Sequence, residues 1–357
     1  MIEEFIRSTQ YFIVLQSLLF SGYLLLNNRL TELPNRFLSM LLIVLGCHMG
    51  INLLGASVSH KGITAVTNSL GFCYGPIVLL YSRSLSNKEQ SFRVRDLWHL
   101  LPALLTFIVT VFTTLTHLIF ALGVLLSLSV YSVMTYLTIR RYHYVLSQTK
   151  SYFELVKLTW LIRLLALQCS ILILNILSVS LMTSGREEIG KVVELGVFVG
   201  LLGMVSLFVF HGLQHPKFFD GVTSEDRCIA QGKPAAKDPV KAELMEKIEA
   251  HMQETKAYLR PGLTIKTLGR QILTNPVLVS QAINSQTGRN FSDYVNRLRI
   301  LDACAMLDAA DHAEQSILEI MLSSGFLTKS NFNRVFKKET GFTPLAYRKR
   351  AQSSDAG

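Results

Sequence analysis

Charged residues are scarce in this chain, and the scarcity is concentrated in its first part. Of the 357 residues, 17% are charged and 50% are hydrophobic. Up to about His211 the chain is a series of apolar runs near the roughly 20 residues that span a bilayer. Beyond Gln214 the apolar residues become periodic and charges become frequent, as in a soluble helical domain. The sequence therefore predicts an all-α protein with a membrane part followed by a water-soluble part.

Cysteine is also scarce, and the few cysteines are scattered. None lies at metal-ligand spacing from another, and they do not form the dense set that builds a disulfide framework. We therefore expect free thiols that pack as small apolar side chains. The five positions are Cys47, Cys73, Cys169, Cys228 and Cys304.

Catalytic and transport motifs are missing as well. The sequence shows no nucleophile–base pair, metal-ligand cluster or phosphate-binding loop, so we predict a protein that is not an enzyme and needs no cofactor or metal. The middle of the last apolar run lacks the lysine of a retinal Schiff base. No charged pair lies near the middle of a run, which argues against an ion-coupled transporter. Residues 1–7 are acidic rather than basic, unlike a secretory signal, so we expect the first run to be retained.

The apolar runs predict seven membrane spans. The fourth and fifth are nearly fused, with Thr116 and His117 as the tight hairpin between them. The expected spans are 9–27, 37–57, 65–84, 97–115, 117–138, 159–182 and 191–213.

Lysine and arginine are distributed unequally between the two sets of span flanks. The poorer set carries Arg7, Lys61, Arg186 and Lys191. The richer set should be cytoplasmic, which places the N-terminus outside and everything beyond His211 in the cytoplasm of a bacterial cell. That set carries Arg29, Arg36, Arg83, Lys88, Arg93, Arg95, Arg140, Arg141, Lys150 and Lys157.

A few polar residues interrupt the spans. His48 and Asn52 stand four apart in the second span, and the others are Asn68, Gln168 and Asn175. Hydrogen bonds between helices are the expected role of such residues. A sensing or transport site is the alternative.

The soluble part begins after a polar connector. Residues 214–239 contain proline, glycine and charges, and we expect a flexible linker there. A helical pattern follows at about 240–256. The predicted domains are a seven-span membrane domain at 1–213, the cytoplasmic linker at 214–239, a DNA-binding domain at 240–352 and a disordered tail at 353–357.

Two similar units of paired helices follow this helix. In the first, Asn275 should cap a helix that starts at Pro276 and stops at Gly288. Val279 and Ile283 should face inward, because they share one face at helical spacing. The outward positions would be Val277, Ser280, Gln281 and Asn284.

The second unit runs from 316 to 341, with a turn at 323–325. Its second helix should be capped by Thr328 and stop at Gly341. Phe332 and Phe336 share one face and should be core. A long helix over 291–309 joins the two units and can set two recognition helices in successive major-groove turns, roughly 34 Å apart. The opposite face of the last helix carries Lys329, Ser330, Asn333, Arg334 and Lys337.

Charge favours DNA as the partner of these units. The whole chain carries a formal charge of +10, and residues 260–350 carry +6. Lysine and arginine neutralise phosphates, and a helix that presents Lys, Arg, Asn and Ser suits base edges in the major groove. We expect double-stranded DNA to bind this surface.

The spacing of these residues resembles that of the AraC-type family of transcription regulators. The resemblance covers roughly 90 residues at the C-terminal end. Its features are Ile317, Ile320, Gly325-Phe326, Ser330, Phe332, Arg334, Phe336-Lys337, Gly341, Thr343-Pro344 and Tyr347-Arg348, with Asn296-Arg297-Leu298-Arg299-Ile300 and Ala303 in the joining helix. A weaker similarity, to AraC-type proteins with seven N-terminal spans, rests on Gly75-Pro76, Tyr81-Ser82-Arg83-Ser84-Leu85 and His99-Leu100-Leu101-Pro102.

The resemblance implies two helix-turn-helix units that read promoter DNA. It places the base-reading positions on Val277, Ser280, Gln281 and Asn284 in the first unit, and on Lys329, Ser330, Asn333 and Arg334 in the second. The chain departs from the family pattern at Gly269, Leu273, Val279 and Met321. The larger Met321 should push its helix pair apart, and the first unit is expected to contribute less to reading than the second.

These observations predict a transcription regulator in the bacterial cytoplasmic membrane, controlled by a small-molecule or membrane signal. RNA polymerase and a second copy of the chain are further candidate partners. One alternative is a receptor or transporter whose tail binds a protein; a membrane enzyme is a weaker one. A regulator whose tail is released by cleavage at 214–239 also remains open.

Overall fold

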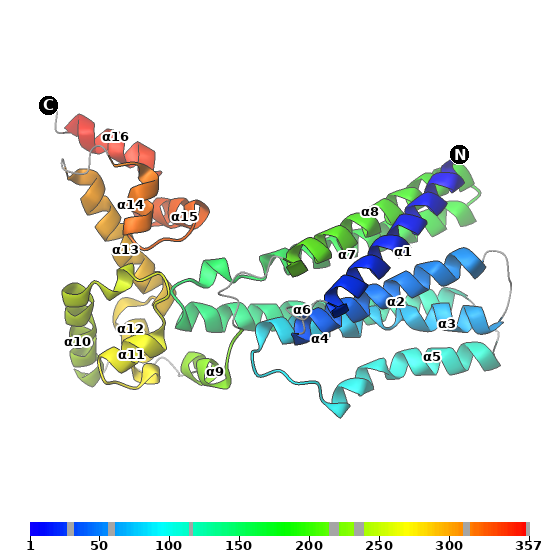
Figure 1. Ribbon diagram of the computed structural model, residues 1–357, viewed down its shortest axis with the longest axis horizontal. Helices are drawn as coiled ribbons and strands as arrows, with labels where there is room; N and C mark the ends of the chain where they lie inside the picture. The colour runs from blue at the N-terminus through cyan, green and yellow to red at the C-terminus, as the bar shows by residue number, and fades with distance from the viewer. Residues whose placement is uncertain are drawn as a thin grey trace. The chain divides into compact units, whose positions relative to one another are not determined.

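The computed structural model consists of helices throughout its described residues (Figure 1). These residues are 1–26, 32–55, 61–113, 117–213, 221–231, 239–309 and 315–354, and no strand occurs among them. An isolated antiparallel bridge pairs Lys150 with Thr264. The chain divides into two compact units, one of residues 1–140 and 158–221, the other of residues 141–157 and 222–357. The all-α fold expected from the sequence is confirmed.

The first unit is a bundle of long apolar helices. Within the described residues, seven segments are long and apolar enough to cross a membrane, as expected from the sequence. Three of them are composite: α3 with α4, η2 with α5, and η3 (Phe153–Leu155) with α7. The helices are α1 (Ile2–Leu26), α2 (Leu33–Gly55), α3 (Lys61–Gly71), α4 (Tyr74–Ser86), η2 (Val94–Leu100), α5 (Leu101–Phe112), α6 (His117–Thr149), α7 (Thr159–Thr183) and α8 (Glu187–Leu213).

The bundle keeps a large apolar surface on its outside. Its helices pack in pairs, α1 against α2 and α8, α7 against α8, α2 against α4 and α3 against α5. Many large side chains nevertheless stay exposed, among them Leu19 and Leu126. Soluble domains rarely leave apolar patches of this kind uncovered, so the length and surface of these helices suit a bilayer.

The third predicted span is broken in the middle. The break falls between Gly71 and Tyr74. Pro76 cannot donate a backbone hydrogen bond to Phe72, which favours a break just before it. At Gly75 a Cβ atom would lie 2.7 Å from the Tyr131 side chain, so glycine allows α4 and α6 to approach closely. Part of the predicted hairpin and Arg29 lie outside the described residues, whereas His117 begins α6.

The second unit is built around one long helix. Two hydrophobic clusters flank it, one with α10–α12 and the first half of α13, the other with the second half of α13, α14, α15 and Tyr347 of α16. The unit contains the end of α6, η3 (Phe153–Leu155), α9 (Ser224–Gln231), α10 (Pro239–Thr255), η4 (Ala257–Leu259), α11 (Ile265–Gln271), α12 (Pro276–Thr287), α13 (Phe291–Asp308), α14 (Ile317–Ser323), α15 (Lys329–Thr340) and α16 (Pro344–Ser354).

Local capping chemistry sets most of the helix ends as expected. The Asn275 side chain accepts a hydrogen bond from the Val277 amide at 2.8 Å, and Pro276 follows at the first helical position. Gly288 and Gly341 end α12 and α15 with φ of +67° and +82°, the left-handed conformation that glycine adopts without strain. Thr328 stands at the N-cap of α15, as expected, although its side chain makes no capping hydrogen bond.

The predicted connector contains a helix that the sequence analysis did not expect. Residues 214–220 and 232–238 lie outside the described residues, but α9 lies between them. A reciprocal pair of bonds between Thr223 and Asp226 caps it, and Ile229 is buried in the first hydrophobic cluster. Because α9 is short, its periodicity was too weak to reveal it. At the other end α16 reaches Ser354, inside the tail that was expected to be disordered.

Gly325 provides a test of this fold. Its φ is +82°, and a Cβ atom there would lie 2.5 Å from the Leu259 carbonyl oxygen. Strain and overlap together predict that Gly325→Ala lowers the free energy of unfolding by about 2–4 kcal/mol. Scanning calorimetry of the full chain in detergent measures this. Gly262→Ala is the matched control, since nothing lies within 4 Å of a Cβ there; equal effects of the two changes would contradict the packing described.

Candidate nucleic-acid interface

The first helix pair meets at an unusually close turn. At Gly269 in α11 a Cβ atom would lie 2.8 Å from the Thr274 carbonyl oxygen and 3.2 Å from Pro276. The chain then turns through Leu273, whose φ is +55° and whose side chain is 91% exposed. Both departures from the family pattern shape the connection between α11 and α12. Gly269, in α11, allows α12 to approach closely, and Leu273, in the turn after α11, carries backbone strain.

The four positions expected to face outward on α12 are covered to different extents. Val277 is half-buried and packs against the first cluster, and Gln281 and Asn284 are also half-buried. Ser280 was expected to be outward, but it is only 4% exposed. Both α9 and α10 pack against α12, and α9 is the helix that sequence reasoning missed. Val279 and Ile283 are fully buried, as predicted.

The second helix pair presents its predicted front to solvent. Lys329, Ser330, Arg334 and Lys337 are exposed, and Asn333 is half-buried. On the back, Phe332 stacks edge-on with Phe326 and Phe336, with ring centroids 5.2 and 5.5 Å apart. The expectation that Phe332 and Phe336 are core is confirmed, because both are fully buried. Met321 is buried in the same cluster.

Comparison with known proteins finds this same part of the chain. A protein-family model described as "Helix-turn-helix domain" matches residues 268–350, which run from α11 into α16. The C-terminal part of the chain is a helix-turn-helix domain of the AraC type.

Relatives of the AraC-type domain are named as transcription regulators. An uncharacterized transcriptional regulatory protein, YesN of Bacillus subtilis, is 32% identical over 27% of this chain and 26% of its own length. An uncharacterized regulator, YobQ of the same species, is 31% identical over 29% of this chain and 44% of its own length. The probable transcription factor PqrA of Proteus vulgaris is 28% identical over 29% of this chain and 81% of its own length. The chain thus spans less than half the length of the first two of these relatives.

Two ion pairs join the second helix pair of the AraC-type domain to the start of α13. Arg289 Nη1 lies 2.7 Å from Glu339 Oε1, and Lys338 Nζ lies 3.3 Å from Asp293 Oδ1. The hydrogen bond to Glu339 raises the pKa of Arg289. These contacts hold the C-terminal end of α15 against α13, so the direction of α15 is fixed relative to the shared helix.

A buried arginine holds the middle of the domain. Arg299 on α13 is 2% exposed. Its Nε donates to the Tyr258 carbonyl at 2.7 Å, and its Nη2 donates to the Arg260 carbonyl at 2.9 Å and to Ser151 Oγ at 3.4 Å. Burial lowers the pKa of Arg299 to about 10. The guanidinium therefore stays charged at neutral pH. Carbonyl dipoles balance its charge, since no carboxylate among the described residues forms an ion pair with it.

A segment from the first half of the chain contacts both candidate reading helices. The segment is 148–154, which covers the end of α6 and the start of η3. Gln148 Oε1 accepts from Asn284 Nδ2 at 3.1 Å, and Glu154 Oε1 lies 2.9 Å from Arg334 Nη2. Between them the Ser151 amide and hydroxyl both donate to the Leu263 carbonyl, at 3.2 and 2.7 Å. The two contacted residues are among those expected to read bases.

An ion cluster ties α9 to α11. Lys266 Nζ lies 2.8 Å from Glu225 Oε2 and 2.9 Å from Asp226 Oδ1, and it donates to Thr223 Oγ1 at 3.1 Å. Burial alone would lower the pKa of Lys266, but the two carboxylates raise it above its usual value. Lys266 thus serves the attachment of α9, although the sequence analysis counted it among the basic charges that favour DNA.

Leu273 allows the strain in the first turn to be measured. Leu273→Gly removes a left-handed strain of about 1–2 kcal/mol and adds a glycine entropy cost of about 0.5–1 kcal/mol. We expect the free energy of unfolding to rise by up to about 1 kcal/mol, as measured by calorimetry of the full chain. Leu273→Ala keeps the strain and removes the exposed side chain, so it serves as the control. A gain with alanine as large as with glycine would show that strain is not the cause.

Proposed function

We propose that the chain is a membrane-embedded one-component transcription regulator. The observation that carries the proposal is the pair of helix-turn-helix units on one shared helix, the second with a basic exposed front. The apolar helices of the first unit support attachment to a membrane. The excess of lysine and arginine on one set of span flanks favours a cytoplasmic AraC-type domain and an outside N-terminus, in a bacterial cytoplasmic membrane.

Base reading falls mainly to α15 in this proposal. Arginine and lysine pair with guanine edges, and asparagine pairs with adenine. Lys329 and Arg334 would read guanine and Asn333 adenine, while Ser330 and Lys337 would contact the backbone. On α12 the same task would fall to Val277, Ser280, Gln281 and Asn284, which are covered to a greater degree in this arrangement. The second unit therefore carries more of the discrimination than the first.

Control of DNA binding would act through segment 148–154. Guanine and adenine both present acceptor atoms in the major groove. Glu154 and Gln148 present acceptor oxygens to Arg334 and Asn284 in the same way. The segment and DNA therefore compete for the same donors. Because the segment continues α6 and leads into α7, a signal that rearranges these helices would reach the reading surface through the chain itself.

The function is tested by selection of DNA. The full chain in nanodiscs is incubated with fragmented bacterial genomic DNA, and the retained fragments are sequenced. Enrichment of a shared sequence is the expected result. If the chain retains no sequence selectively, alone or with the Glu154→Gln change described below, the tail binds some other partner, such as a protein.

Arg334→Ala tests the assignment of base reading. We expect a loss of about 1–3 kcal/mol in discrimination at one base pair, measured as the affinity ratio between the selected site and its single-base variants. Lys337→Ala should instead weaken binding to all sequences alike, with a smaller dependence on salt. Unchanged discrimination in Arg334→Ala would remove this residue from the reading surface.

Glu154→Gln tests the control by segment 148–154. The pair with Arg334 is half exposed on the arginine side, and such a pair contributes up to about 1 kcal/mol. Its loss should raise the affinity of the full chain for its DNA by roughly two- to five-fold. Glu246→Gln on the exposed face of α10 removes the same charge elsewhere and is the control. Equal gains in DNA affinity in the two variants would show that the effect comes from net charge alone. That result would contradict competition between segment 148–154 and DNA.

A further inference from the structure

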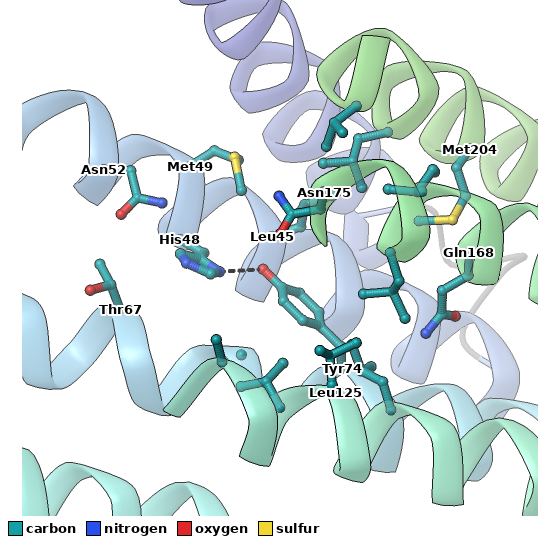
Figure 2. A pocket seen from close by; sticks show the side chains of 18 of the residues that line it. Leu45, His48, Met49, Asn52, Thr67, Tyr74, Leu125, Gln168, Asn175 and Met204 are labelled. Atoms are coloured by element: carbon teal, nitrogen blue, oxygen red, sulfur yellow. Dashed lines mark hydrogen bonds between the residues drawn. The ribbon is translucent and has the colours of Figure 1, made fainter. Parts of the chain in front are cut away.

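The bundle of apolar helices contains a partly open cavity of about 600 Å³ (Figure 2). It lies among α2, α3, α4, α6, α7 and α8, and the residues that line it are mostly leucine, isoleucine, valine and phenylalanine. No Asp, Glu, Lys or Arg is among the lining residues described. Its volume falls in the range of roughly 300–1,000 Å³ typical of small-molecule sites.

Polar side chains from several helices interrupt this apolar wall. His48 Nδ1 on α2 and the Tyr74 hydroxyl on α4 are hydrogen-bonded at 2.7 Å (Figure 2). The amide of Asn52, also on α2, lines the same cavity. On α7 the amides of Gln168 and Asn175 also line the cavity. They stand seven residues apart and so share one face of the helix. The polar groups therefore enter the cavity from more than one side.

One of these polar groups lacks a partner. The Asn68 side chain on α3 lines the cavity, and its Nδ2 atom is buried with no hydrogen-bond partner among the described residues. Interhelical hydrogen bonds are the role expected of such residues from the sequence. His48 forms one, but Asn68 Nδ2 does not. A buried donor without an acceptor is costly, and a ligand oxygen within the cavity would supply the acceptor.

We propose that this cavity binds an uncharged, largely apolar molecule that carries a hydroxyl or carbonyl group. Amide side chains both donate and accept hydrogen bonds, which suits either group. The lining has no opposite charge to compensate an ion, so a carboxylate or ammonium ligand would be disfavoured. This inference rests on the proposed function, in which such a molecule is the signal.

The test uses 1-decanol as the uncharged probe. Radiolabelled decanol is titrated into the full chain in phosphatidylcholine nanodiscs at pH 8, and empty nanodiscs give the linear partition into lipid. We expect a saturable component of one decanol per chain. Decanoate and decyltrimethylammonium have the same chain length but carry a charge, and they should compete at least about tenfold more weakly. Dioleoylglycerol added to the nanodisc distinguishes two sources of the ligand. If it competes with decanol, the ligand is a membrane lipid; if it does not compete, the ligand is a single-chain molecule.

Substitutions in the wall connect the binding to the cavity. Asn68→Leu and Gln168→Leu should each weaken saturable decanol binding by about tenfold, because each removes a hydrogen bond of roughly 1.4 kcal/mol. Thr135→Val is the matched control: its hydroxyl is buried and unpartnered among the described residues, and it does not line the cavity. If Asn68→Leu does not elute as folded protein, Gln168→Leu decides.

Three results would overturn the proposal. The first is the absence of saturable decanol binding to the unmodified chain. The second is saturable binding that neither wall substitution weakens, and the third is saturable binding that decanoate displaces as well as decanol does. The binding assay contains no DNA, so its failure alongside sequence-selective retention of DNA would remove the cavity inference and leave the proposed function standing.

Discussion

The buried guanidinium of Arg299 is the constraint on which the second unit depends. It lies on the helix shared by both hydrophobic clusters, and it donates to carbonyls at Tyr258 and Arg260 and to Ser151 Oγ. It also lies 5.7 Å from the ring centroid of Phe326, in the turn before α15. A buried charge persists only when hydrogen bonds satisfy it. The region before α11, segment 148–154 and the second helix pair must therefore all keep their places around this one side chain.

That constraint has a consequence for DNA binding. Ser151 is held by Arg299 and by the Leu263 carbonyl, which places Gln148 and Glu154, on either side of it, against the two helices proposed to read bases. The contact with α12 is a neutral hydrogen bond, and the contact with α15 is an ion pair that is half exposed on the arginine side. Both are weak by nature. Segment 148–154 is therefore anchored by buried hydrogen bonds but contacts α12 and α15 only through weak ones. Such contacts suit a DNA-free state from which the segment can be displaced reversibly.

Local physical chemistry made much of the architecture predictable from the sequence. Apolar runs of bilayer length gave the seven candidate spans, and helical periodicity placed Val279, Ile283, Phe332 and Phe336 in the cores. The roles of Asn275, Gly288 and Gly341 followed from capping preferences, which depend on neighbouring residues alone. Thr328 stands at the N-cap position of α15, but its hydroxyl makes no capping hydrogen bond.

The contacts that cover α12 could not be predicted in this way. Gln148 and Asn284 are 136 residues apart, and no periodicity reports such a pairing. Ser280 is likewise buried on α12, the helix against which α9 packs. The sequence signal for α9 was its cap, Thr223 with Asp226, which does not stand out in a connector rich in polar residues. The cavity in the bundle also results from packing between helices that are distant in sequence. Its polar residues could be identified from the sequence, but only the structure shows that they line one cavity.

Amide hydrogen exchange of segment 148–154 tests the competition between this segment and DNA most directly. The full chain in nanodiscs is measured with and without the DNA that it selects. Competition predicts that DNA speeds exchange at the Ser151 amide, which is bonded to the Leu263 carbonyl, while α15 becomes protected. Protection of α15 with unchanged or slower exchange at Ser151 would contradict it.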